Sequence, residues 1–410
     1  MTQFVWRVAA FILVTALLAP ALRAADVRQF NTRHYLVHTD LDAALCADLA
    51  QRLDAMYDEY DQRLSIFRGH GHIPRLEVYL FRTQQEYLTF TQGKMQNSGG
   101  MFLPSQNLLA AFLGDQGRDQ LRRTLQHEAF HQFAYNAIAI QLPVWLNEGL
   151  AQFFEEGLWN GDGFLLGEVP PRRLRQLQLD VSTGRLLDFE ALLHMRNDVW
   201  ARRLAASRAD GVTQYNQSWA MVHFLVMGKN AAGEYAYRSR LLEMLRLVHT
   251  GKSTDEAFSA AFGTNVEGFR KRFVEYATNL RATPEATLIE NQGVLADLLI
   301  DFDRTGRRFD DIESFRRFVT RGRYRLHYSR GELSWDTDPD MNCYFRDLAG
   351  RPFAPDELYL APRTGAPIPD IVCRCNDRLL LRTRFHDADN RSVDHELLIE
   401  PVRSSVSISQ

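Results

Sequence analysis

Two histidines and a glutamate in the segment HEAFH have the types and the spacing of a metal site. His127 and His131 are four positions apart, so on an α-helix both imidazoles lie on one face and can bind one metal ion. Glu128 stands beside them, where its carboxylate can serve as the base of a hydrolytic reaction. The same pattern arises by chance in roughly a few chains per hundred of this size, and the alternative interpretation is a surface helix with two solvated histidines.

A third ligand is needed, because zinc in a hydrolytic site takes three protein ligands and keeps a fourth position for water. Glu148, in the sequence WLNEGLAQFF, fits this role on the helix that follows. We therefore predict a Zn2+ site formed by His127, His131 and Glu148, with Glu128 as the general base.

Apolar spacing indicates the two helices that must hold these groups. Leu121, Leu125, Ala129 and Phe133 recur every four residues, which is typical of a helix with one buried face. Pro143 then interrupts the pattern and suits the first turn of a second helix. Together the two helices would bring the three ligands into one site.

The helix pair with HExxH and LNEGLAQ resembles the gluzincin metallopeptidases, specifically the peptidase MA-like family of bacterial proteins. The match of motifs is confined to these two helices and one later tyrosine, while the order of elements is similar over about residues 30–280. The resemblance implies a zinc ion held by His127, His131 and Glu148, with Glu128 as general base. It also implies a peptide or protein substrate.

The resemblance assigns two further roles. Related enzymes commonly have a second acid four residues after the ligand glutamate, which orients a zinc histidine. This chain has Gln152 there, whose neutral amide oxygen would accept the histidine N–H and leave the ligand less basic. A tyrosine or histidine of a later helix hydrogen-bonds the developing oxyanion in related enzymes, and Tyr215 fits by order and position. The alternative for Tyr215 is an aromatic side chain packed in the core, and His223 on the same helix is expected to be a core histidine.

A β-hairpin is expected directly before the metal helix, from residues 99–104 and 107–113. In gluzincins the edge strand of the sheet lies along the cleft and pairs with an extended peptide. The resemblance therefore implies that this hairpin supplies the edge strand and binds substrate by β-augmentation. The alternative is an ordinary core strand.

The patterns predict an α+β fold in two parts. The first is a gluzincin-like metallopeptidase domain at residues 25–282, with a small mixed sheet, the HExxH helix and a helical second half. Residues 283–294 are interpreted as a linker, and strand-like segments after a short helix predict a small β-rich C-terminal domain at residues 295–410. Ser253 and Thr264 are each followed three positions later by a glutamate, which predicts two capping boxes.

Residues 1–24 have the pattern of a secretion signal. Arg7 precedes an apolar stretch that is too short to span a bilayer, and small residues follow, so we expect cleavage after Ala24 and export to the periplasm or out of the cell. A retained membrane anchor is the alternative. No other segment is apolar enough to cross a membrane, so no stable membrane span is expected after cleavage.

The charge pattern gives little indication of a polyanionic partner. The net charge is −3, so neither nucleic acid nor an acidic membrane surface is expected as a partner. The cluster of Arg172, Arg173 and Arg175 is interpreted as a solvated face.

The sequence has four cysteines. Cys46 lies in a helical pattern and is expected to be a small buried hydrophobe. In an oxidising compartment Cys343 could form a disulfide with Cys373 or with Cys375. A second zinc site from these three thiols would lack a recognisable fourth ligand.

These features predict a secreted or periplasmic zinc metallopeptidase, a hydrolase that uses zinc-activated water with Glu128 as general base. One alternative is a zinc-containing binding or structural protein without turnover, although such a protein would not need the carboxylate of Glu128. Another is a zinc amidase acting on cell-wall peptides, with the same site chemistry and a different cleft.

Overall fold

The structure is a computed structural model, and it describes residues 27–67, 74–93, 98–138, 142–322, 324–330, 333–376, 379–387 and 393–402. The expected secretion signal at residues 1–24 lies outside the described residues. In the part of the chain that is described, no helix combines the length and the apolar character that crossing a membrane requires.

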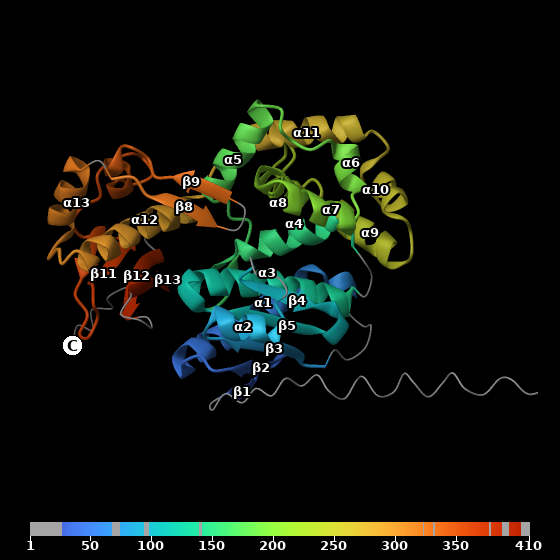
Figure 1. Ribbon diagram of the computed structural model, residues 1–410. Helices are drawn as coiled ribbons and strands as arrows, with labels where there is room; N and C mark the ends of the chain where they lie inside the picture. Colours follow the sequence, from blue (N-terminus) through green and yellow to red (C-terminus); the bar gives the residue numbers. More distant parts are fainter. Residues whose placement is uncertain are drawn as a thin grey trace, which may run out of the picture.

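A mixed five-stranded sheet forms the base of the first part (Figure 1). Its order is β1 (Arg28–Asn31), β2 (Tyr35–Thr39), β3 (Leu76–Phe81), β5 (Leu108–Phe112) and β4 (Gly100–Leu103). The three central strands are parallel, and β1 and β4 join them antiparallel. The hairpin predicted before the metal helix is therefore present, and β4 lies at an edge of the sheet, as the resemblance implies.

Helices cover both faces of this sheet because both faces are apolar. Successive side chains of a strand point to opposite faces, and the apolar ones on each face are buried by helices. Val78 and Leu109 belong to a large core with α1 (Ala43–Arg63) and α3 (Gly117–Ala137). Tyr87 of α2 (Gln84–Phe90) packs with Met101 and Ala110 in a smaller core on the opposite face. α2 is short and begins at a capping box of Thr83, and the apolar spacing of the sequence does not predict it.

The middle of the chain is helical, and it lies above the sheet and α3 in Figure 1. α4 follows α3, and a two-stranded hairpin joins it to a group of seven helices. The elements are α4 (Val144–Glu155), β6 (Leu158–Trp159), β7 (Phe164–Leu165), α5 (Pro171–Ser182), α6 (Phe189–Leu193), α7 (Asn197–Ala206), α8 (Arg208–Met227), α9 (Arg238–His249), α10 (Thr254–Phe262) and α11 (Val266–Asn279). Their apolar faces extend the core that α1 and α3 share with the sheet.

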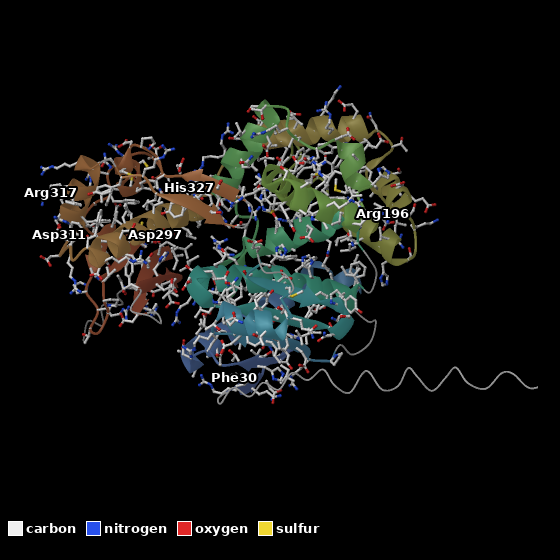
Figure 2. The ribbon with its side chains drawn as sticks, viewed as in Figure 1. Phe30, Arg196, Asp297, Asp311, Arg317 and His327 are labelled. Carbon is white, nitrogen blue, oxygen red and sulfur yellow. The ribbon has the colours of Figure 1, made fainter. Side chains whose placement is uncertain are left out.

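The C-terminal part has a core of its own. It contains α12 (Pro284–Arg304), α13 (Ile312–Arg321), the hairpin of β8 (His327–Arg330) and β9 (Leu333–Asp336), and an antiparallel sheet of β10 (Leu358–Ala361), β11 (Asp370–Arg374), β12 (Leu379–Asp387) and β13 (Val393–Pro401). Figure 2 places Asp297 of α12 and His327 of β8 in this part. The expectation of a β-rich C-terminal region is confirmed. The sequence DADN at residues 387–390 predicts a turn between the last two strands, and most of it lies outside the described residues.

The expected linker at residues 283–294 is not an irregular segment. Pro284 occupies the first turn of α12 after the N-cap residue Thr283, a position that favours proline because no backbone N–H is needed there. Leu288 and Val294 are then buried in the C-terminal core. The segment is the first half of α12, and its proline begins the helix.

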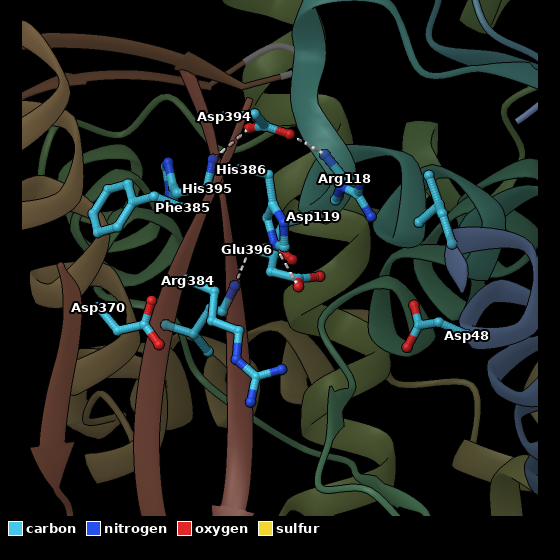
Figure 3. A network of polar contacts seen from close by, with 12 residues as sticks. Asp48, Arg118, Asp119, Asp370, Arg384, Phe385, His386, Asp394, His395 and Glu396 are labelled. Carbon is cyan, nitrogen blue, oxygen red and sulfur yellow. Dashed lines mark hydrogen bonds and ion pairs between the residues drawn. The ribbon is translucent and has the colours of Figure 1, made fainter. Parts of the chain in front are cut away.

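The C-terminal sheet packs directly against the helix that carries HExxH (Figure 3). Arg122 of α3 is 5 % exposed and contacts Asp48, Asp119 and Glu396 within 2.9 Å. The Leu397 backbone N–H donates to Asp119 at 2.9 Å. A buried arginine with three carboxylates therefore joins α1, α3 and β13 five residues before His127.

All four cysteines are free thiols. Cys46 is buried as expected, but the disulfide expected from Cys343 is not formed. Burial raises the pKa of Cys343 to about 11 and that of Cys373 to about 12. Only the thiolate reacts in disulfide exchange, so thiols with raised pKa values are poor partners for it.

Candidate metal centre

α3 holds the two histidines on the side opposite its buried stripe. Leu121, Leu125, Ala129 and Phe133 are all fully buried, so the predicted apolar face is confirmed. The Tyr60 hydroxyl of α1 donates to the Gln126 carbonyl at 2.6 Å. α3 is thus fixed to α1, and His127 and His131 face α4.

α4 presents Glu148 to these histidines because its neighbour is a glycine. A Cβ at Gly149 would lie 2.5 Å from the Ser218 carbonyl oxygen and 2.7 Å from Val222 Cγ2. Both distances are shorter than van der Waals contact, so only glycine allows α8 to pass this close to α4. This close approach of α8 to α4 determines how near Glu148 lies to the two histidines.

Three donor atoms converge between α3 and α4. His127 Nε2 and His131 Nε2 are 3.2 Å apart, and Glu148 Oε2 lies 3.5 and 3.6 Å from them. Ligands bonded to zinc at about 2.0–2.1 Å in a tetrahedron are about 3.4 Å from one another. Among the described residues, these three form the one cluster of histidine, cysteine or acidic side chains with this closeness, and their geometry fits zinc.

A carboxylate orients His127, but it is not at the expected position. His127 Nδ1 lies 3.0 Å from Glu155 Oε2, so Nδ1–H donates to this oxygen and the Nε2 lone pair is directed to the metal position. Gln152 is instead bonded by Arg173, whose Nη1 donates to its amide oxygen at 2.7 Å. The expectation that Gln152 accepts the histidine N–H is therefore wrong, and the acceptor is charged.

Two arginines of α5 bind the carboxylate of Glu156, the residue that follows Glu155 on α4. Glu156 is 2 % exposed and accepts hydrogen bonds at 2.6–2.7 Å from Arg123, Arg172 and Arg173. A buried carboxylate requires such partners, because its charge is costly outside water. The expectation of a solvated face is thus wrong for Arg172 and Arg173, which are buried, whereas Arg175 is exposed.

The charges at the site favour a bound cation. Burial by itself opposes protonation of His127, but its hydrogen bonds to Glu148 and Glu155 outweigh burial and raise its pKa well above the ordinary value. Burial would raise the pKa of Glu148, yet the two histidines lower it overall. Two half-buried carboxylates thus require positive charge between them, which a proton or a metal ion can supply.

Glu128 lies between the ligands and the edge of the sheet. Its Oε2 accepts a hydrogen bond of 2.8 Å from the backbone N–H of Phe102 in β4. The Phe112 N–H donates to the Gly99 carbonyl, so the next outward-facing backbone groups of this strand belong to Gly100 and Phe102. The outer edge of β4 therefore faces the candidate base, with the N–H and C=O groups of Gly100 bonded to the Ser98 hydroxyl.

The structure places the two later candidates on α8. Tyr215 is half-buried and its ring lies edge-on to Trp200, with centroids 5.1 Å apart. His223 is buried, and its ring nitrogens bond the Tyr276 hydroxyl at 2.7 Å and the Gly167 carbonyl at 3.1 Å. His223 is therefore a core histidine, as expected. α8 packs on α4 beside Glu148, but the oxyanion role of Tyr215 stays a prediction.

Sequence reasoning missed Glu155, Arg173 and the N–H of Phe102. Glu155 is seven positions after Glu148, so both lie on one face of α4, two turns apart. A search of the whole helical face, including the seventh position, would have found it. Nothing in the sequence indicates that a backbone group of β4 meets Glu128.

Comparisons with known proteins give one match to a family model, and it covers part of the chain. The sequence model of a family described as "Protein of unknown function (DUF1570)" matches residues 122–238. None of the curated proteins matches the chain. The matched segment begins in α3 before His127 and ends in α9 after His223, so it contains His127, Glu128, His131, Glu148 and Glu155 but not Phe102 of β4.

Proposed function

We propose that this protein is an exported zinc-dependent peptidase of the gluzincin type, which hydrolyses peptide bonds with Glu128 as general base. One observation carries the proposal: three ligand atoms converge on one position, with a carboxylate beside them that lies against an edge strand. The mixed sheet, the HExxH helix and the helical second half support the likeness to gluzincins. The secretion pattern of residues 1–24 supports export.

His127, His131 and Glu148 would hold the zinc ion, and Glu155 would keep the Nε2 lone pair of His127 directed at it. Zinc bound at such a site lowers the pKa of a coordinated water to about 7 and polarises a carbonyl group. Glu128 then accepts the proton of the attacking water and delivers it to the leaving amine.

The edge of β4 is suited to align an extended peptide. Gly100 and Phe102 direct their N–H and C=O groups away from β5. A substrate strand that pairs with this edge would place its backbone next to Glu128, since Phe102 already contacts that carboxylate. A carbonyl of the substrate would replace Glu128 as acceptor of the Phe102 N–H, which frees the base.

A matched pair of proteins tests this function. The wild-type mature chain and the Glu128→Gln variant, both loaded with zinc, are incubated with an unbiased peptide library, and the products are identified by mass spectrometry. Cleavage by the wild type with at least a 100-fold loss in the variant is expected. Equal cleavage by both proteins would refute the role of Glu128, and no cleavage by either would favour a zinc-binding protein without turnover or a different amide substrate.

A further inference from the structure

Two aromatic side chains stand together beside the candidate base. Phe102 of β4 and Tyr135 of α3 have ring centroids 5.5 Å apart, inclined by 60°. Tyr135 is 50 % exposed, which is unusual for a large aromatic residue on a helix that is otherwise well packed. The two rings come from different elements and form an apolar surface that water contacts.

Both residues are tied to the catalytic groups. Tyr135 follows His131 by four positions and Glu128 by seven, so all three lie on the same side of α3. Phe102 donates its backbone N–H to Glu128 at 2.8 Å. The aromatic pair therefore borders the position at which the scissile bond would lie.

Strand geometry decides which substrate group meets this pair. Met101 points to the α2 side of the sheet, where it packs with Tyr87. Phe102, the next residue, points to the α3 side, opposite Leu109 of β5. A peptide that replaced the Ser98 and Glu128 side chains at the outer edge would lie about 4.8 Å from β4. One of its side chains on the α3 face would then lie directly beside the ring of Phe102.

We propose that Phe102 and Tyr135 form a subsite that binds an aromatic or large aliphatic side chain of an extended peptide. This inference rests on the proposed function, because it assumes that peptide aligns along β4. The side-chain amides of Asn107 and Asn136 are neutral and bond each other at 2.9 and 2.7 Å, so they offer no charge to a lysine or glutamate side chain. The carboxylate of Glu128 accepts from the Phe102 N–H and serves as the candidate base, so the two rings themselves offer apolar area and no charge.

Binding is measured without turnover, in the zinc-loaded Glu128→Gln protein. The probes are peptides that are identical except for phenylalanine, leucine, alanine or lysine at one position, which is scanned along the peptide. At one position the phenylalanine and leucine peptides should bind roughly 10-fold more tightly than the alanine peptide. Adding Tyr135→Ser should reduce this ratio to below about 3, whereas Tyr135→Phe should keep it.

Tyr235→Ser is the matched control, because Tyr235 is also an exposed tyrosine. Its ring contacts the guanidinium of Arg238, and it belongs to neither β4 nor α3. It should leave the ratio unchanged. Melting temperatures within a few degrees of the parent show that the variants fold. Equal affinity for the phenylalanine and alanine peptides at every position, a preference that survives Tyr135→Ser, or no binding at all would overturn the subsite.

Digestion of the same peptides by the wild type separates this inference from the proposed function. Cleavage without preference for apolar side chains would refute the subsite and leave the peptidase proposal intact. Selective binding that depends on Tyr135, without cleavage by the wild type, would confirm the subsite and refute the peptidase proposal.

Discussion

Replacing Glu155 by glutamine should weaken zinc binding while leaving all three ligands in place. Glutamine has nearly the same volume and still offers an oxygen, so the substitution removes mainly the negative charge next to His127. The hydrogen bond of 3.0 Å joins two side chains that are each 16 % exposed, and solvent therefore screens it little. The change isolates the contribution of a charged acceptor.

The size of the effect follows from the type of hydrogen bond. A hydrogen bond to a charged group contributes about 1.5–3 kcal/mol, and 1.36 kcal/mol corresponds to a factor of ten. Substitution of residues that orient metal ligands typically costs 10–100-fold in metal affinity. We therefore expect the dissociation constant for zinc to rise by about 10- to 100-fold.

Competition with a chromophoric chelator at fixed pH measures this constant. Glu243→Gln serves as the control, because Glu243 is an exposed glutamate of α9 that pairs only with Arg246 among the contacts that the structure describes. It should bind zinc as the wild type does. An affinity within about threefold of the wild type for Glu155→Gln would refute the assignment of Glu155 as the orienting acid.

Three further outcomes follow from the packing and the charges. Gly149→Ala should destabilise the protein by about 1–3 kcal/mol, since the added Cβ would clash with α8. Gly293→Ala should stabilise it by up to about 1 kcal/mol, because this helical position has open space where the Cβ would lie. Denaturant unfolding measures both changes, and a change of the same sign in both variants would contradict the packing. Burial lowers the pKa of His223 to about 4, so the unfolded chain binds more protons between pH 6.5 and 4, and stability present above pH 6.5 is lost as the pH falls through this window. The wild type should lose about 3 kcal/mol more over that range than His223→Gln, and parallel pH profiles would show that His223 is not buried. Tyr215→Phe should keep the contact with Trp200 and lower turnover by about 10²–10³ if the hydroxyl stabilises the oxyanion, while turnover within a few-fold of the wild type would assign Tyr215 to the core.

The pairing of the two histidines was predictable from the sequence because helical geometry determines it. Residues four apart on a helix share a face, and the buried stripe of α3 leaves His127 and His131 on the side toward α4. Glu148 followed from its place early in the next helix. Glu155 did not follow, because the resemblance implies an orienting acid at the fourth position after Glu148, and this chain has it at the seventh.

Buried charge was the least predictable feature of the chain. Arg172 and Arg173 have the composition of a solvated face, and only the fold shows that Glu156 lies between them. Arg122 likewise meets Glu396 from the other end of the chain. Such pairs depend on long-range packing, which local spacing does not encode.

Local signals were reliable where one interaction dominates and failed where several compete. Ser253 forms the predicted capping box with Glu256. The second predicted box is wrong, since the Asn265 side chain, and not that of Thr264, accepts from the Gly268 N–H and begins α11. Asparagine is as good an N-cap as threonine or better, and one position of shift changes the cap without changing the helix.

Metal analysis of the purified mature chain tests the zinc site most directly. Inductively coupled plasma mass spectrometry after mild purification and zinc titration should find about one zinc ion per chain in the wild type and in Glu128→Gln, and a large loss in Glu148→Ala, because the base is not a ligand and Glu148 is. A wild-type chain that holds no zinc and takes up none on titration would contradict the account.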